Sequence, residues 1–164
     1  MKRHSDLPLP ARRHVPGSGS TPDRGPLEAA RADPDLCFTY GIDLFNHGLF
    51  WEAHEVWEAV WLASPPNSGR RQGLRALIQM ANGGLKLAMG KPRALARLAG
   101  EVQGLAGDAD LTAEGIDMAA LADAFAGFAA AVLQRGRAID RPEAQTGFPL
   151  ITVSAHQPMS GAAS

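Results

Sequence analysis

The stretch FNHGLFWEAHEVWEAVW, residues 45–61, decides the fold of this chain. Its large apolar residues recur with the period of an α-helix, since Trp57 and Trp61 each fall within about 20° of Phe50 at 100° per residue. Gly48 is typical of a residue that lies just past a helix C-terminus. The stretch therefore predicts one helix that ends just before Gly48 and a second helix that starts just after it.

The helical period continues on both sides of this stretch. Several apolar stripes follow one another, short loops separate them, and no strands alternate with them. This pattern predicts an all-α fold, a single compact bundle of about five helices. The expected helices cover residues 34–47, 49–62, 69–89, 92–105 and 117–135.

The composition changes at both ends of the chain. Residues 1–33 hold many prolines and glycines and few large apolar residues, so we expect a disordered tail there. His4 and His14 lie in that segment, and we do not count them as ligands because ordering them would cost entropy. Residues 34–136 form the expected helical domain. Residues 137–164 are expected to be an extended or disordered tail, of which FPLITV lies on the bundle.

The overall charge and the single cysteine exclude several classes of protein. The 164 residues carry 16 Lys and Arg against 17 Asp and Glu, a net charge of −1. A nucleic-acid or membrane surface would need an excess of basic residues, so neither partner is expected. The sequence shows no signal peptide and no span, so we expect a cytoplasmic protein. Cys37 has apolar neighbours and no second cysteine, so it is expected to be a buried free thiol.

Polar residues gather along one edge of the apolar face of the second expected helix. At 100° per residue His54 lies about 40° from Phe50 and Glu58 lies about 80° from it, and the two are one turn apart. Glu55 and Trp51 continue the same edge, and Glu52 is expected near the outer face. A carboxylate at the edge of a core needs a partner, because the desolvation of an unpaired charge is costly.

The third expected helix offers such partners. Gly83 and Gly84 in this helix are expected to permit a close helix crossing. An antiparallel hairpin would then bring a polar stripe of the third helix alongside the acidic edge of the second. This stripe consists of Arg71, Arg75, Gln79, Asn82 and Lys86.

Two interpretations of this network rest on its charges. In the first it is structural, and ion pairs between the two helices fix the register of the hairpin. In the second it binds a divalent metal, because HEVWE resembles the helical HExxH zinc motif, with His54 and Glu58 as the nitrogen and oxygen ligands. A third ligand would come from one of four neighbours, Asp43, Asn46, His47 or Glu55.

A third interpretation is the recognition of a small molecule or another protein. Trp51 is expected to be partly exposed, and Arg71 or Arg75 beside it could hold an anionic ligand. A binding or interaction module is the leading interpretation, with a metal-dependent hydrolase as the alternative and no cofactor besides a divalent metal. A second copy of the chain is a further candidate partner. The expected site comprises Asn46, Trp51, Glu52, His54, Glu55, Glu58, Arg71, Arg75 and Gln79.

The same residues resemble a known family signature. The opening stretch is similar to the FNxGxFxEAHEVxExxW signature of domain-of-unknown-function family 309, a family of small bacterial and archaeal proteins. A second block, RALIQMANGGLKLAMGKPRAL, resembles a QGLIQ-type helix of that family, with Arg75 and Ala76 in place of the usual glutamine and glycine, and Lys91 in place of a frequent asparagine. The resemblance covers about residues 38–135. It implies an all-helical fold and assigns no reaction.

Overall fold

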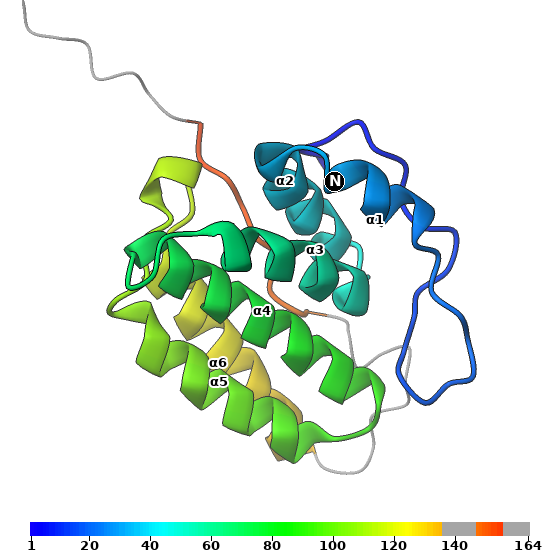
Figure 1. Cartoon of the computed structure of the whole chain (residues 1–164). Coiled ribbons are helices and arrows are strands. Elements are labelled where there is room, and N and C mark those ends of the chain that lie inside the picture. The colour runs from blue at the N-terminus through cyan, green and yellow to red at the C-terminus, as the bar shows by residue number, and fades with distance from the viewer. Residues whose placement is uncertain (136–146, 156–164) are drawn as a thin grey trace, which may run out of the picture.

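The computed structural model describes residues 1–135 and 147–155. Over these ranges the structure is a helical bundle without strands, which confirms the predicted all-α class (Figure 1). Most of the predicted C-terminal tail, residues 137–146 and 156–164, lies outside the described residues. The helices are α1 (Gly25–Ala30), α2 (Pro34–Asn46), α3 (Phe50–Ala63), α4 (Gly69–Ala88), α5 (Pro92–Ala106) and α6 (Met118–Arg135), with a short 3-10 helix at Thr112–Glu114.

Several ends of the five longer helices follow from local sequence. The Asp33 carboxylate accepts N–H groups of the first turn of α2, the Ser68 hydroxyl does the same for α4, and Asp117 does so for α6. Gly48 and Gly90 follow α2 and α4 with φ values of 73° and 71°, a left-handed conformation that glycine adopts without strain. These signals explain why the predicted helix boundaries agree closely with the structure.

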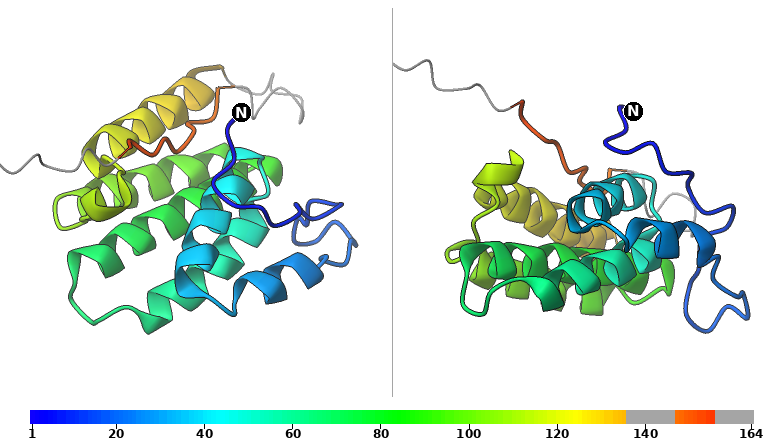
Figure 2. Two further views of the ribbon diagram at one scale, coloured as in Figure 1. Left: turned by 90° about the horizontal axis from the view of Figure 1, so that it is seen from above. Right: turned by 45° about the horizontal axis from the view of Figure 1, so that its top comes forward.

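Helix α3 lies between α2 and α4, and the helices pack in chain order from α2 to α6 (Figure 2). Trp57 of α3 is fully buried, and its indole Nε1 donates to the carbonyl of Phe38 at 3.1 Å. Glycines make room for the α3 rings. A Cβ atom at Gly41 would lie 2.1 Å from Trp57 Nε1, and one at Gly84 would lie 2.5 Å from the Phe50 ring. The prediction of a close crossing at the glycines of α4 is confirmed.

The N-terminal residues differ from the expected disordered tail. They run along α2 and α3 and contain α1, which buries Leu27 and Ala30 (Figure 2). Leu7 and Leu9 also pack against the core. A segment with few apolar residues holds this position because its main chain bonds to polar groups of α2 and α3.

The described part of the C-terminal segment, residues 147–155, is extended and wedged between α6 and the α2–α3 pair (Figure 1). Phe148 contacts four aromatic rings with centroid distances of 4.7–5.7 Å. Those rings belong to Phe45, Phe50, Phe125 and Phe128. The segment is thus part of the core, and it joins the two ends of the bundle.

Cys37 is a buried free thiol, as the sequence predicts. Its Sγ donates to the carbonyl of Val56, 3.1 Å away, and its exposed fraction is 2%. Burial raises the pKa of Cys37 to about 11, so the thiol stays protonated at neutral pH.

Helix α6 alone among the described helices is long and apolar enough to span a membrane, with a mean hydropathy of 1.2. Its buried face, which includes Phe125 and Val132, packs in the bundle. A core helix of a soluble protein meets the same criterion, so the cytoplasmic location stays a prediction.

The contact between α2 and α3 can be tested with two glycine substitutions. Gly41→Ala would force a methyl group into the Trp57 ring, so we expect it to lower the free energy of unfolding by about 3 kcal/mol. Gly100→Ala in α5 is the matched control, because no atom lies within 4 Å of the added Cβ. It should raise the free energy of unfolding by about 0.5–1 kcal/mol, since alanine favours a helix interior. Urea denaturation measures both, and equal effects would contradict the packing described.

Candidate metal centre on helix α3

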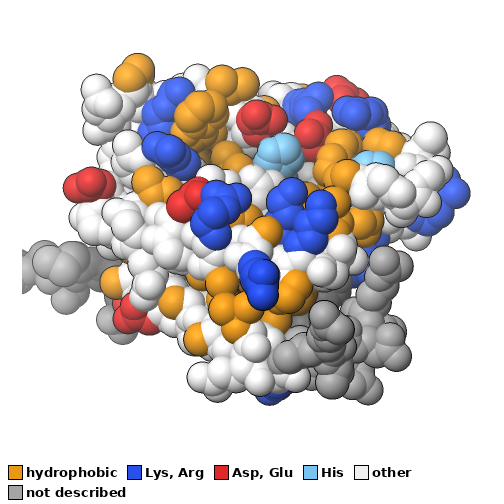
Figure 3. All heavy atoms as spheres, turned by 90° about the horizontal axis from the view of Figure 1, so that it is seen from below, with side chains coloured by type: hydrophobic (Ala, Val, Ile, Leu, Met, Phe, Trp, Pro, Cys, Tyr) orange, Lys and Arg blue, Asp and Glu red, His pale blue; other side chains and the backbone are white. Residues whose placement is uncertain are grey.

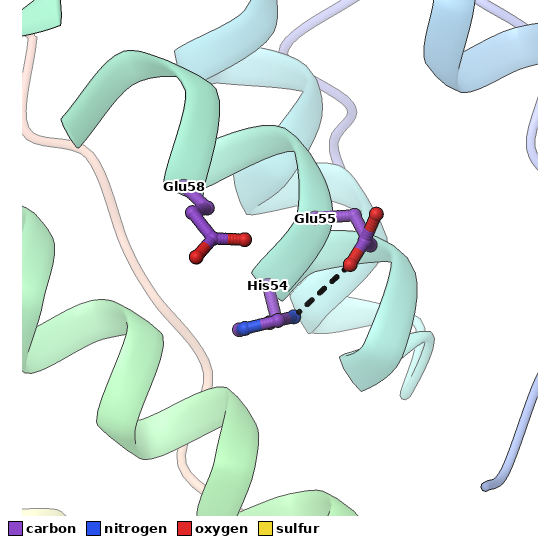
Figure 4. A group of neighbouring side chains, drawn as sticks. All are labelled: His54, Glu55 and Glu58. Carbon is purple, nitrogen blue, oxygen red and sulfur yellow. Dashed lines mark ion pairs between the residues drawn. The ribbon is translucent and has the colours of Figure 1, made fainter. Parts of the chain in front are cut away.

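Three side chains form a compact group on α3. His54, Glu55 and Glu58 each offer one ligand atom, and these atoms all lie within 4.8 Å of one another. Figure 4 shows the His54 ring between the two carboxylates. The side chains of His54 and Glu55 are 24% and 20% exposed, and Glu58 is exposed. The group is therefore open to solvent on one side and supported by protein on the other.

Neighbouring charges orient this group. His54 Nδ1 lies 3.7 Å from Glu55 Oε1, and this buried nitrogen has no hydrogen-bond partner among the described residues. The other oxygen, Glu55 Oε2, lies 3.7 Å from both Arg24 and Arg31. The two arginines thus hold one carboxylate oxygen while the second faces the imidazole. This arrangement leaves two possible metal-ligand atoms, His54 Nδ1 and Glu55 Oε1, without strong competing bonds.

The donor set suits a divalent transition metal. Imidazole nitrogen and carboxylate oxygen are ligands of zinc, manganese and related ions, with bond lengths of about 2.0–2.2 Å. Two donors on one ion are then at most about 4.3 Å apart. Small side-chain rotations would bring this group from its separation of up to 4.8 Å to that range. Of the four predicted candidates for a third ligand, the structure places Glu55 with His54 and Glu58.

Asn46 has a structural role that the sequence did not indicate. Its side-chain nitrogen donates to the carbonyl of Ile151 at 2.9 Å, and its side-chain oxygen accepts the N–H of Ile151 at 2.8 Å. The amide therefore acts as a short piece of β-strand that holds the C-terminal segment. Nothing adjacent in the sequence marks a partner that lies 105 residues away.

Three predicted partners on α4 have other contacts. Arg71 donates to the carbonyl of Ser64 at 2.7 Å and stacks on the Trp61 ring. Gln79 donates to Glu101 of α5 at 2.8 Å. Arg75 is exposed, and within residues 1–135 and 147–155 it forms no hydrogen bond or ion pair. The structure does not bring these residues to the acidic edge of α3, because the polar stripe turns toward α5 and toward the end of α3.

Trp51 is covered by the N-terminal segment. The His14 ring meets it edge-on at 4.7 Å, and the Arg24 guanidinium lies 5.2 Å from its centroid. The predicted pairing of Trp51 with Arg71 or Arg75 is therefore replaced by contacts with residues that were expected to be disordered.

Glu52 is buried, although its helical angle predicts a place near the outer face. The same segment covers it, and the amide of His14 donates to Glu52 Oε1 at 2.8 Å. Glu52 Oε2 is buried and has no partner among the described residues. Burial raises the pKa of Glu52 above its ordinary value, while the hydrogen bond from His14 opposes the shift.

The surface around the group carries charges of both signs. Figure 3 shows a histidine beside acidic side chains, with lysine and arginine side chains on several sides of them. A cation bound by the acidic group would therefore have basic neighbours, which favour an anion as an additional ligand of that cation.

Comparison with protein-family models finds a match over part of the chain. Residues 38–98 match the model of the family described as "Domain of unknown function (DUF309)". The matched segment runs from α2 into α5 and contains the whole of α3 and α4. No curated protein and no solved structure matches the chain.

The burial of Glu52 predicts a pH-dependent effect of the substitution Glu52→Gln. At low pH the carboxyl is protonated in both the folded and the unfolded state, so wild type and variant should differ least there. As pH rises above the ordinary carboxyl value, the unfolded state loses this proton while the folded state retains it. Wild type should therefore lose stability relative to Glu52→Gln as the pH is raised from 4 to 8. The measurements are made at intervals of about one pH unit. Thermal denaturation across this range measures the difference, and a constant difference would contradict the assignment.

Proposed function

We propose that this domain, in which residues 38–98 match the DUF309 family model, binds a divalent transition-metal ion through His54, Glu55 and Glu58. The observation that carries the proposal is the convergence of one imidazole and two carboxylates within 4.8 Å on a single helix. The family name assigns no activity, so the proposal rests on these residues.

The proposal is supported by the bonding of the candidate ligand atoms. A buried polar nitrogen without a partner is costly, and His54 Nδ1 is such a nitrogen. A metal ion would satisfy it and would neutralise the two carboxylates at the same time. Arg24 and Arg31 act from outside by fixing Glu55 Oε2, so that Oε1 faces the centre of the group.

Helix α3 is a rigid platform for such a site. His54 and Glu58 are separated by one helical turn, and their backbone positions are fixed by the burial of Trp57 between them. A site on a packed helix needs only side-chain rotations to close on an ion, so little ordering entropy opposes binding.

A metal-dependent hydrolase, the alternative that the sequence leaves open, would use the same three residues. Three protein ligands leave a coordination position for water, and hydrolytic metal sites are built in this way. The basic side chains around the group would suit an anionic substrate (Figure 3). Metal binding is the first step of both functions, and the experiment below addresses that step.

Isothermal titration of untagged protein with Zn²⁺, Mn²⁺, Co²⁺ and Ni²⁺ tests the proposal. We expect one ion per chain, and we expect His54→Ala and Glu58→Gln each to weaken binding by about tenfold or more, because each removes a ligand. Both side chains lie at the surface edge, so the fold should survive, and circular dichroism checks this.

Asp123→Asn is the matched control, since it removes an exposed carboxylate of α6. It should bind metal like wild type. The proposal is wrong if wild type binds none of the four ions, or if the control and the two ligand variants lose affinity equally.

A further inference from the structure

Helices α2 and α3 bury polar groups that no other helix satisfies among the described residues. Asp43 is 1% exposed, Glu52 is fully buried, and the ring of Tyr40 is fully buried. A buried carboxylate without donors is strongly unfavourable, so these groups need partners. All three find them in residues 3–14, which we call the N-terminal strap.

Asp43 is held by the first part of the strap. The amide of His4 donates to Oδ1 at 2.7 Å, and the amide and hydroxyl of Ser5 both donate to Oδ2, at 2.9 and 2.7 Å. The Arg3 guanidinium lies 3.6 Å from the same carboxylate. Three donors and one cation thus converge on one buried acid.

The rest of the strap is held in the same manner. The hydroxyl of Tyr40 donates to the carbonyl of Pro8 at 2.8 Å, and Glu52 accepts the amide of His14. Leu7 and Leu9 pack against the core between these contacts. The strap is therefore bound through main-chain groups together with side chains of both polar and apolar residues, as an extended peptide is bound by a protein.

We infer that the face of α2 and α3 that carries Tyr40, Asp43 and Glu52 is a binding site for an extended peptide, and that residues 3–14 occupy it as an intramolecular ligand. This site is separate from the metal group and does not depend on the proposed metal binding. Its ligand is a polypeptide segment with adjacent N–H groups for Asp43 and a basic residue before them.

Two further observations favour a ligand over an integral part of the domain. The three binding groups lie within the family segment 38–98, while the strap lies outside it. The strap also leaves Glu52 Oε2 buried and without a partner. A peptide with a hydrogen-bonding side chain near the position of His14 would satisfy this oxygen and bind more tightly than the strap does.

Binding in trans tests the inference. The probe is a fluorescein-labelled peptide of residues 1–15, and the receptor is the full chain with His4→Pro and Ser5→Pro, which lack the two amide donors to Asp43. Fluorescence anisotropy should show the probe binding this variant at least about tenfold more tightly than wild type, because the tethered wild-type strap competes at high effective concentration. Adding Asp43→Asn to the variant should remove most of this gain.

A probe that itself carries proline at positions 4 and 5 is the matched control, and it should not bind. A folded double variant that binds the probe no better than wild type would overturn the inference. If the double variant does not fold, hydrogen exchange of wild type decides. The amides of His4, Ser5 and His14 should then exchange at least about tenfold faster than those of α3 and α4, through release of the strap alone. Equal rates would show that the strap leaves only on global unfolding, and the inference would be wrong.

Discussion

The enclosure of α3 between two glycine-bearing helices is the constraint on which the rest of the structure depends. Trp57 reaches the backbone of α2 at Gly41, and Phe50 reaches the backbone of α4 at Gly84. With large rings locked on both sides, α3 cannot rotate about its axis. The edge of α3 that carries His54, Glu55 and Glu58 is therefore fixed in direction, and this makes a group of side chains a candidate site.

Polar residues near the start of α3 divide into two kinds by their contacts. Asp43, Asn46 and Glu52 form hydrogen bonds to main-chain groups near the two ends of the described chain. These segments supply partners that the other helices of the bundle do not. His54, which is half-buried, and Glu58, which is exposed, make no such bonds to the chain ends. The polar residues that form one cluster in the sequence therefore have two roles in the structure. Some make structural hydrogen bonds, and the group on α3 has ligand atoms available to bind an ion.

The helices could be predicted because their signals are local. Period, capping residues and glycines act within a few positions, and the bundle follows from them. The proximity of His54 to Glu58 is likewise a property of helix geometry alone. The contacts of Glu52 and Asn46 could not be predicted, because their partners are main-chain groups of distant segments, and an amide N–H has no sequence signature. The helical period of α4 alone does not show the contacts of its polar stripe, because α5 offers Glu101 as a partner for Gln79 and the carbonyl of Ser64 accepts from Arg71.

The aromatic wedge of residues 147–155 ties the order of synthesis to the order of folding. Phe148 packs among aromatic rings of α2, α3 and α6. Asn46 is hydrogen-bonded to Ile151, which lies 105 residues later in the sequence. A chain still emerging from the ribosome can pair α2 with α3 and α4 early, since these contacts are local. It cannot fill the space between the α2–α3 pair and α6 until residues 147–155 have been made. Until then the rings of α2, α3 and α6 lack their contacts with Phe148, and this gap in the core closes last.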